Sequence, residues 1–186
     1  MLKKVWVVIF LFSLILSCAS CGTIAGTENG VYSKYNIHYF KKGRTAVASC
    51  ENFTECPGHS FLPYNSKITA ESWKRGLRFV DVKTGKEILF EYKGEVMGGM
   101  SKEEYVRLIT STAPVSYEGL SDKDKEGIAA GKAMVGMTKQ GVMIALGYPA
   151  KIKTLSTDQN TWIYWKGRMT NLVVEFDDNG NVKSAK

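Results

Sequence analysis

The chain has 186 residues, a formal net charge of +7 and a hydrophobic content of 44%. This length allows one or two small domains, and the hydrophobic content is ordinary for a folded protein, which argues against a disordered chain. The basic residues are scattered along the sequence and form no cluster, which argues against nucleic acid as a partner.

The first predicted element is a leader. Lys3 and Lys4 precede an apolar run from Val5 to Leu16. This run is shorter than the roughly 20 residues that span a bilayer. It therefore predicts a secretory signal peptide over residues 1–17 rather than a transmembrane helix.

The leader ends in a lipidation signal. Residues 14–18, Leu-Ile-Leu-Ser-Cys, resemble the bacterial lipobox, so Cys18 is the expected site of lipid attachment and Cys21 is the competing site. An ordinary cleaved signal with a free cysteine is the remaining alternative. Two or more acyl chains hold a protein stably on a membrane. Because Ala19 rather than Asp follows Cys18, the resemblance to sorted lipoproteins implies the periplasmic face of the outer membrane.

A short polar tether and a β-rich region follow. Residues 18–31 are small and polar, which predicts a lipidated tether. Residues 32–97 predict a small β domain, because about five short segments have strand periodicity at close spacing. Such spacing is typical of a small barrel or a curled sheet. The segment from Phe61 to Ile68 resembles the core of an SH3-like barrel.

Cys50 and Cys56 enclose a polar loop in this region. An oxidising periplasm favours a disulfide between them, and so short a loop stabilises the fold by about 2–3 kcal/mol. Their spacing differs from that of a zinc knuckle, and His59 is the only histidine nearby. We therefore expect no metal and no cofactor.

Residues 100–186 predict a helical linker and an α/β-sheet domain. Ser101 begins a capping box, and Tyr105, Leu108 and Ile109 share one face of the helix that follows. A second helix begins at Ser121, with Gly131 as a weak point inside it.

The next helix is predicted from its ends. Thr138 is a suitable N-cap, and Val142 and Leu146 share one face. Gly147 suits a left-handed C-terminal position, and Pro149 stops the helix.

Two strands and two turns then follow. The segments from Thr161 to Trp165 and from Leu172 to Phe176 are β-branched and aromatic, which favours strands. Residues 166–168 predict a tight hairpin between them. Residues 178–180, Asp-Asn-Gly, predict a second turn, and Val182 begins a short third strand.

In this order, the motif residues resemble the SmpA/OmlA (BamE) family of outer-membrane lipoproteins. The residues that carry the resemblance are Gly136, Met137, Thr138, Val142, Leu146, Gly147, Pro149, Trp162, Tyr164, Phe176, Asp177 and Gly180. The resemblance implies a helix pair on a three-stranded antiparallel sheet and a scaffold role in outer-membrane β-barrel assembly. Two features depart from the family: Gly141 lies inside a helix, and residues 22–118 form a large additional region.

These observations lead to three functional hypotheses. The first is a non-catalytic scaffold lipoprotein whose partners are β-barrel assembly proteins or anionic lipid headgroups. The alternative is an SH3-like binder of peptidoglycan, with a groove lined by aromatic residues. An enzyme is disfavoured, because neither His38 nor His59 lies in a nucleophile motif and Asp177-Asp178 is typical of a turn. The candidate groove residues are Tyr35, Tyr39, Phe61, Tyr64 and Trp73. For these, a buried core is nevertheless the favoured interpretation. The same interpretation is favoured for Trp162, Tyr164 and Phe176.

Overall fold

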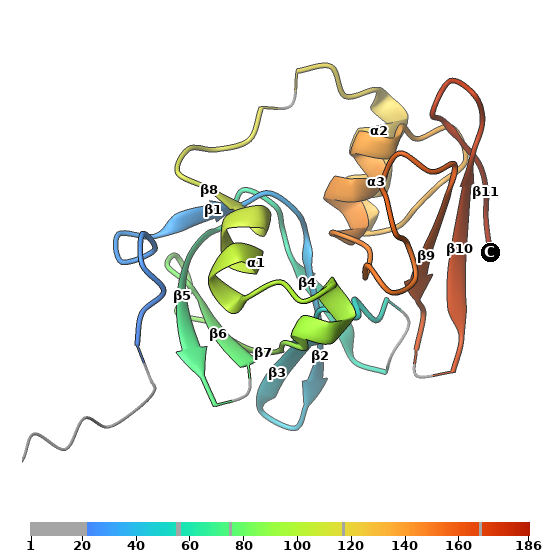
Figure 1. The fold of residues 1–186 in the computed structure, drawn as a ribbon. Coiled ribbons are helices and arrows are strands. Elements are labelled where there is room, and N and C mark those ends of the chain that lie inside the picture. The colour runs from blue at the N-terminus through green and yellow to red at the C-terminus, as the bar shows by residue number, and fades with distance from the viewer. Residues whose placement is uncertain (1–21, 55–56, 75, 117, 168) are drawn as a thin grey trace, which may run out of the picture.

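Figure 1 shows the fold in a computed structural model that describes residues 22–54, 57–74, 76–116, 118–167 and 169–186. The predicted α+β class is confirmed: a curled half-barrel sheet is followed by helices and by a C-terminal sheet of three antiparallel strands. The signal peptide, Cys18 and Cys21 lie outside the described residues. Within these ranges, no helix is both long enough and apolar enough to cross a bilayer.

The half-barrel contains eight described strands in the order β4-β2-β3-β7-β6-β5-β1-β8. Neighbours are antiparallel except for β3 and β7, which run parallel. Along β6 and β7, buried side chains alternate with more exposed ones, as a sheet with one covered face requires. The strands are β1 (Val31–Ser33), β2 (Ile37–Lys42), β3 (Thr45–Ser49), β4 (His59–Leu62), β5 (Lys67–Trp73), β6 (Gly76–Asp81), β7 (Glu87–Glu91) and β8 (Thr110–Ser111).

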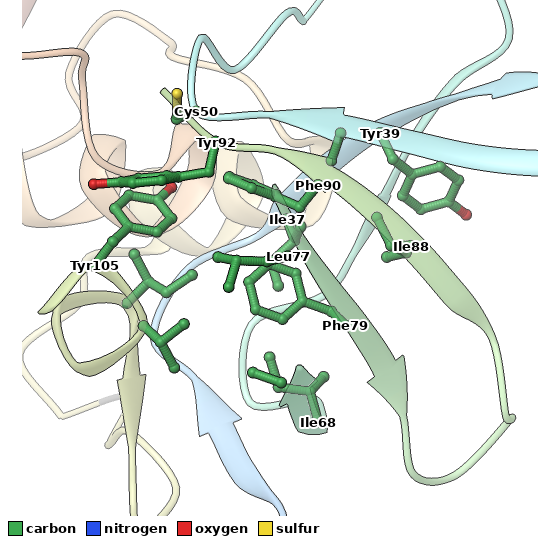
Figure 2. Close-up of a cluster of buried hydrophobic side chains, with 14 of the residues drawn as sticks. Ile37, Tyr39, Cys50, Ile68, Leu77, Phe79, Ile88, Phe90, Tyr92 and Tyr105 are labelled. Carbon is green, nitrogen blue, oxygen red and sulfur yellow. The ribbon is translucent and has the colours of Figure 1, made fainter. Parts of the chain in front are cut away.

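The first helix closes the half-barrel and belongs to its core. In α1 (Lys102–Ile109), Tyr105, Val106 and Ile109 are buried among the strands' apolar side chains. Figure 2 shows Tyr105 stacked against Tyr92 at one end of this cluster, and their ring centroids are 4.9 Å apart. A 3₁₀-helix, η1 (Gly94–Met97), joins β7 to α1. Residues beyond 97 thus complete the β domain, although we expected them to form a linker.

The segment before β1 also packs against the half-barrel. Thr23 bridges to Glu71 of β5, and the Ile24 amide donates to the Ala70 carbonyl at 2.8 Å. The Ile24 side chain is only 4% exposed. The tether prediction for residues 18–31 is therefore wrong from residue 23 onward, because this segment continues the sheet alongside β5.

The C-terminal part consists of a helix pair and a three-stranded sheet, as predicted. The sheet order is β11-β10-β9, with both pairs antiparallel. Figure 1 shows the helices on one side of this sheet, with the half-barrel on their other side. The elements are α2 (Asp122–Ala130), α3 (Lys139–Leu146), β9 (Thr161–Trp165), β10 (Asn171–Phe176) and β11 (Val182–Ala185).

The predicted helix ends are confirmed at the N-caps and corrected at two glycines. Ser101, Ser121 and Thr138 each accept a backbone N–H of the first turn. Gly131 ends α2 at a φ of 63°, in the left-handed region, so it is a C-cap and not a weak point inside the helix. Gly147 has the expected positive φ, 82°, but its ψ of −174° is extended rather than left-handed.

Candidate functional site

The residues that carry the family resemblance lie together as the core of the C-terminal part. Met137, Val142 and Leu146 are fully buried, and Trp162 packs edge-on against Phe176 with ring centroids 4.8 Å apart. The Tyr164 hydroxyl donates to the Gly147 carbonyl at 3.1 Å. Buried aromatics of this size dominate a small core. Trp162, Tyr164 and Phe176 are thus structural, as the favoured interpretation predicted.

The other residues of the motif shape the backbone around this core. Gly136 has a φ of 90°, and its amide donates to the Val182 carbonyl of β11 at 2.8 Å. Pro149 is buried after the end of α3. The Asp177 carboxylate accepts two backbone amides of the second turn, from residues 179 and 181.

Gly141, which departs from the family pattern, is explained by a buried carboxylate. Asp124 of α2 is fully buried, and its oxygens accept from the backbone amides and hydroxyls of Ser121 and Thr138. A Cβ atom at position 141 would lie 1.9 Å from Asp124 Oδ1. One carboxylate thus caps both α2 and α3, and only glycine leaves room for it.

Two polar side chains of the half-barrel join it to the helix pair. Asn36 Nδ2 donates to the carbonyls of Ile128 in α2 and Ala145 in α3, at 2.8 and 3.2 Å. His38 Nε2 lies 2.7 Å from the same Ala145 carbonyl. Both side chains are buried, and the last carbonyls of a helix need such partners. We call Asn36 and His38 the polar joint.

The only two histidines of the chain meet at this joint. His38 Nδ1 lies 2.8 Å from His59 Nε2. Because a carbonyl can only accept, His38 donates through Nε2–H and accepts the His59 proton at Nδ1. Burial lowers the pKa of His38 from 6.5 to about 4, and the nearby His59 ring adds to this effect against the opposing Ala145 hydrogen bond. His38 is therefore neutral near pH 7. The sequence pattern gave no signal for this pairing.

The predicted disulfide stays a prediction, because Cys56 lies outside the described residues. Cys50 is buried beside Tyr92, as Figure 2 shows, and its Sγ lies 4.0 Å from the Lys93 carbonyl oxygen. Burial raises the pKa of the Cys50 thiol. In the reduced protein this thiol is therefore protonated and poorly reactive.

Most of the predicted aromatic groove lies elsewhere. Tyr39 and Tyr64 are buried, and Tyr35 and Phe61 are half-buried around the joint between the two parts. Tyr39 and Tyr35 line two separate grooves of about 450 and 460 Å³, whereas Trp73 lines a groove of about 700 Å³.

That groove is the candidate functional site, and we call it the Trp73 groove. Its volume is about 700 Å³. Val47 of β3 and Leu89 of β7 are paired across the parallel strands and alternate with core residues, so they point outward into it. Lys74 Nζ lies 4.7 Å from the centre of the Trp73 ring. The remaining lining residues are Gly76, Phe90, Glu91, Tyr92, Lys93 and Glu95.

The groove presents an apolar floor with charges of both signs at its rim. At Gly76 the backbone of β6 lies so close to β7 that a Cβ there would be 2.2 Å from the Phe90 carbonyl oxygen. Lys93 Nζ is 2.9 Å from a Glu51 oxygen. An apolar floor with a charged rim is suited to binding and orienting a ligand.

Other chemistry is less well supported by the described residues. Among them, no three His, Cys, Asp or Glu side chains are grouped as metal ligands. The Trp73 groove is lined by Glu91 and Glu95 together with Lys74 and Lys93, and its other lining residues are apolar or glycine.

Comparisons with models of protein families, with curated proteins and with solved structures gave no match for this chain.

Proposed function

We propose that the protein is a lipid-anchored, non-catalytic binding protein of the bacterial outer membrane, facing the periplasm. The Trp73 groove is its contact surface, and components of outer-membrane β-barrel assembly are its partners. The predicted lipobox at Cys18, with Cys21 as the competing site, and the ordered motif residues of the C-terminal part support this proposal.

The observation that carries the proposal is where the chain enters the fold. The Ser72 amide donates to the Gly22 carbonyl at 2.9 Å, and the next residue, Trp73, lines the groove. Three residues separate Cys18 from Gly22, and the four Cα–Cα steps span about 14 Å at most when extended. A lipid on either cysteine would therefore keep the groove close to the membrane surface.

The BamE-like assignment of the C-terminal part belongs to this proposal. A helix pair on a three-stranded antiparallel sheet is the arrangement that the resemblance implies. The half-barrel is the feature that the family does not explain, and we propose that it supplies the specific contact.

Photocrosslinking in cells tests the partner. A photoreactive residue at Leu89, on the floor of the groove, should capture a β-barrel assembly protein. The same residue at Lys183, exposed on β11, is the matched control. Equal capture from both positions, or none from Leu89, would contradict the proposed surface.

The anchor is tested separately. The Cys18→Ser variant should lose acylation and move to the soluble fraction. If the variant stays acylated and membrane-bound, the lipid is on Cys21. If it stays acylated but is released from the membrane, the lipid is not the anchor.

The second candidate function is binding of peptidoglycan by the SH3-like half-barrel. An indole beside a charged rim, as in the Trp73 groove, favours it. Sedimentation with purified cell wall separates the two functions: the wall binder should pellet at moderate salt, and its Trp73→Ala variant should not.

A further inference from the structure

A second groove lies at one end of the half-barrel and is strongly basic. Lys41, Lys42 and Arg44 belong to the β2–β3 hairpin, and Lys83 and Lys86 belong to the turn between β6 and β7. The parallel register, with Ala46 opposite Ile88, places the starts of β3 and β7 together. The two turns therefore lie side by side, although the five cations look scattered in the sequence.

None of these five cations has an ion-pair partner among the described residues, although Glu87 also lines the groove. Among the described residues, no carboxylate lies within 4 Å of any of the five. Asp81 is occupied by the turn, where it accepts from the amides of Lys83 and Thr84. Glu87 lies 3.6 Å from Arg78 instead. Converging like charges favour an anion at this end of the sheet.

A buried hydroxyl is directed at the same place. Lys86 Nζ donates to the Tyr39 hydroxyl at 2.5 Å and lies 4.7 Å from the centre of its ring. Tyr39 is only 3% exposed. Figure 2 shows its hydroxyl oxygen pointing away from the other labelled core side chains. The Ser60 side chain is a second hydrogen-bond partner of this hydroxyl, so the oxygen is fixed beside Lys86 at the groove.

The basic groove adjoins the Trp73 groove. It has a volume of about 450 Å³ and is lined by Tyr39, Lys41, Arg44, Thr45, Ala46, Lys86, Glu87 and Leu89. Leu89 lines both grooves. Three residues of β7 separate Glu87 in the basic groove from Glu91 in the apolar one, which is about 13 Å along a strand.

We propose that the two grooves together form a binding site for one phospholipid-like amphiphile. The phosphate lies among Arg44, Lys86 and the Tyr39 hydroxyl, where the guanidinium fork matches phosphate oxygens. An acyl chain runs from Leu89 over Val47 to Trp73. This site takes a single lipid molecule and does not depend on the proposed assembly partner.

Binding of matched probes tests the proposal on the exported chain carrying Cys18→Ser and Cys21→Ser, which stays free of its own lipid. The probes are palmitoyl lysophosphatidic acid below its micelle concentration, glycerol 3-phosphate and monopalmitoyl glycerol. Each buried methylene strengthens binding about fourfold, so the lysolipid should bind at least about 100-fold more tightly than glycerol 3-phosphate. Equal binding of these two would reduce the site to an anion site and overturn the proposal.

Charge and apolar variants locate the site. Arg44→Gln with Lys86→Gln should weaken lysolipid binding about 25-fold, because each cation near an anionic headgroup contributes about fivefold. Lys132→Gln with Lys183→Gln removes the same charge from the C-terminal part and should leave binding unchanged. Leu89→Ser should weaken binding of the lysolipid but not of glycerol 3-phosphate, whereas Leu155→Ser, on an exposed loop, should change neither. Equal losses from the test and control variants would refute the assignment.

Discussion

Lowering the pH should weaken the fold through His38. Its pKa is about 4 in the folded protein, against 6.5 for an unperturbed histidine. Between these pH values the His38 imidazole is protonated in the unfolded chain but neutral in the folded protein. The free energy of unfolding therefore falls as the pH drops from about 6.5 towards 4. Integration over this window gives a loss of about 2 kcal/mol by pH 5 and about 3 kcal/mol by pH 4.

Urea denaturation at pH 7, 6, 5 and 4 measures this loss. Carboxylates also titrate at the acidic end, so the informative quantity is the difference between the wild type and His38→Gln. The variant should lose about 3 kcal/mol less than the wild type between pH 7 and pH 4. His59→Gln should keep most of the pH step, because His38 remains buried against Ala145. If the free energy of unfolding fell equally with pH in the wild type and in His38→Gln, the reasoning would be refuted.

Three further changes test the structure. Gly141→Ala should destabilise the protein by about 2–4 kcal/mol in urea titration, because the new Cβ would overlap the buried Asp124 carboxylate. This loss is expected although alanine has the higher helix propensity. The control Gln140→Ala, on the exposed face of α3, should change stability by less than about 0.5 kcal/mol. Asn36→Ala should cost about 3 kcal/mol or more, since it removes two buried hydrogen bonds to helix carbonyls and leaves the Tyr64 amide without its acceptor. A loss below about 1 kcal/mol would contradict the polar joint. Thiol counting in denaturant, on protein taken directly from the periplasm, should find no free thiol at Cys50 and Cys56; two reactive thiols would rule out the disulfide.

Local signals in the sequence predicted the C-terminal part well. Thr138, Gly147 and Pro149 mark the ends of α3. β9 is an unbroken run of β-branched and aromatic residues, and half of the six residues of β10 are of these types. Each of these features depends on neighbours within a few positions, so a single sequence contains enough information to place it.

The half-barrel was harder to predict because its strands are short or built from small residues. β3 contains two alanines and a serine, which carry weak strand signals, and β8 has only two residues. Tyr35, which appeared to alternate with Ile37 and Tyr39, lies between β1 and β2. There the backbone turns to bond with the carbonyls of Ile109 and Ile144 instead.

The candidate sites depend on contacts between distant parts of the chain. The basic groove forms only because β3 and β7 run parallel, a pairing that no local pattern predicts. The same holds for His38, which lies 107 residues from the carbonyl that it contacts. The Gly141 departure also becomes intelligible only when Asp124 is placed beside it.

The parallel pairing also sets the order in which the sheet can assemble. Hairpins such as β2–β3 and β5–β6 pair segments that are adjacent in the sequence. The pairing of β3 with β7, by contrast, must close the whole loop between Ala46 and Ile88. Closing so long a loop before its contacts form is slow. The centre of the sheet therefore stays unpaired until residues 45–91 are together, and its strand edges are open to aggregation until then.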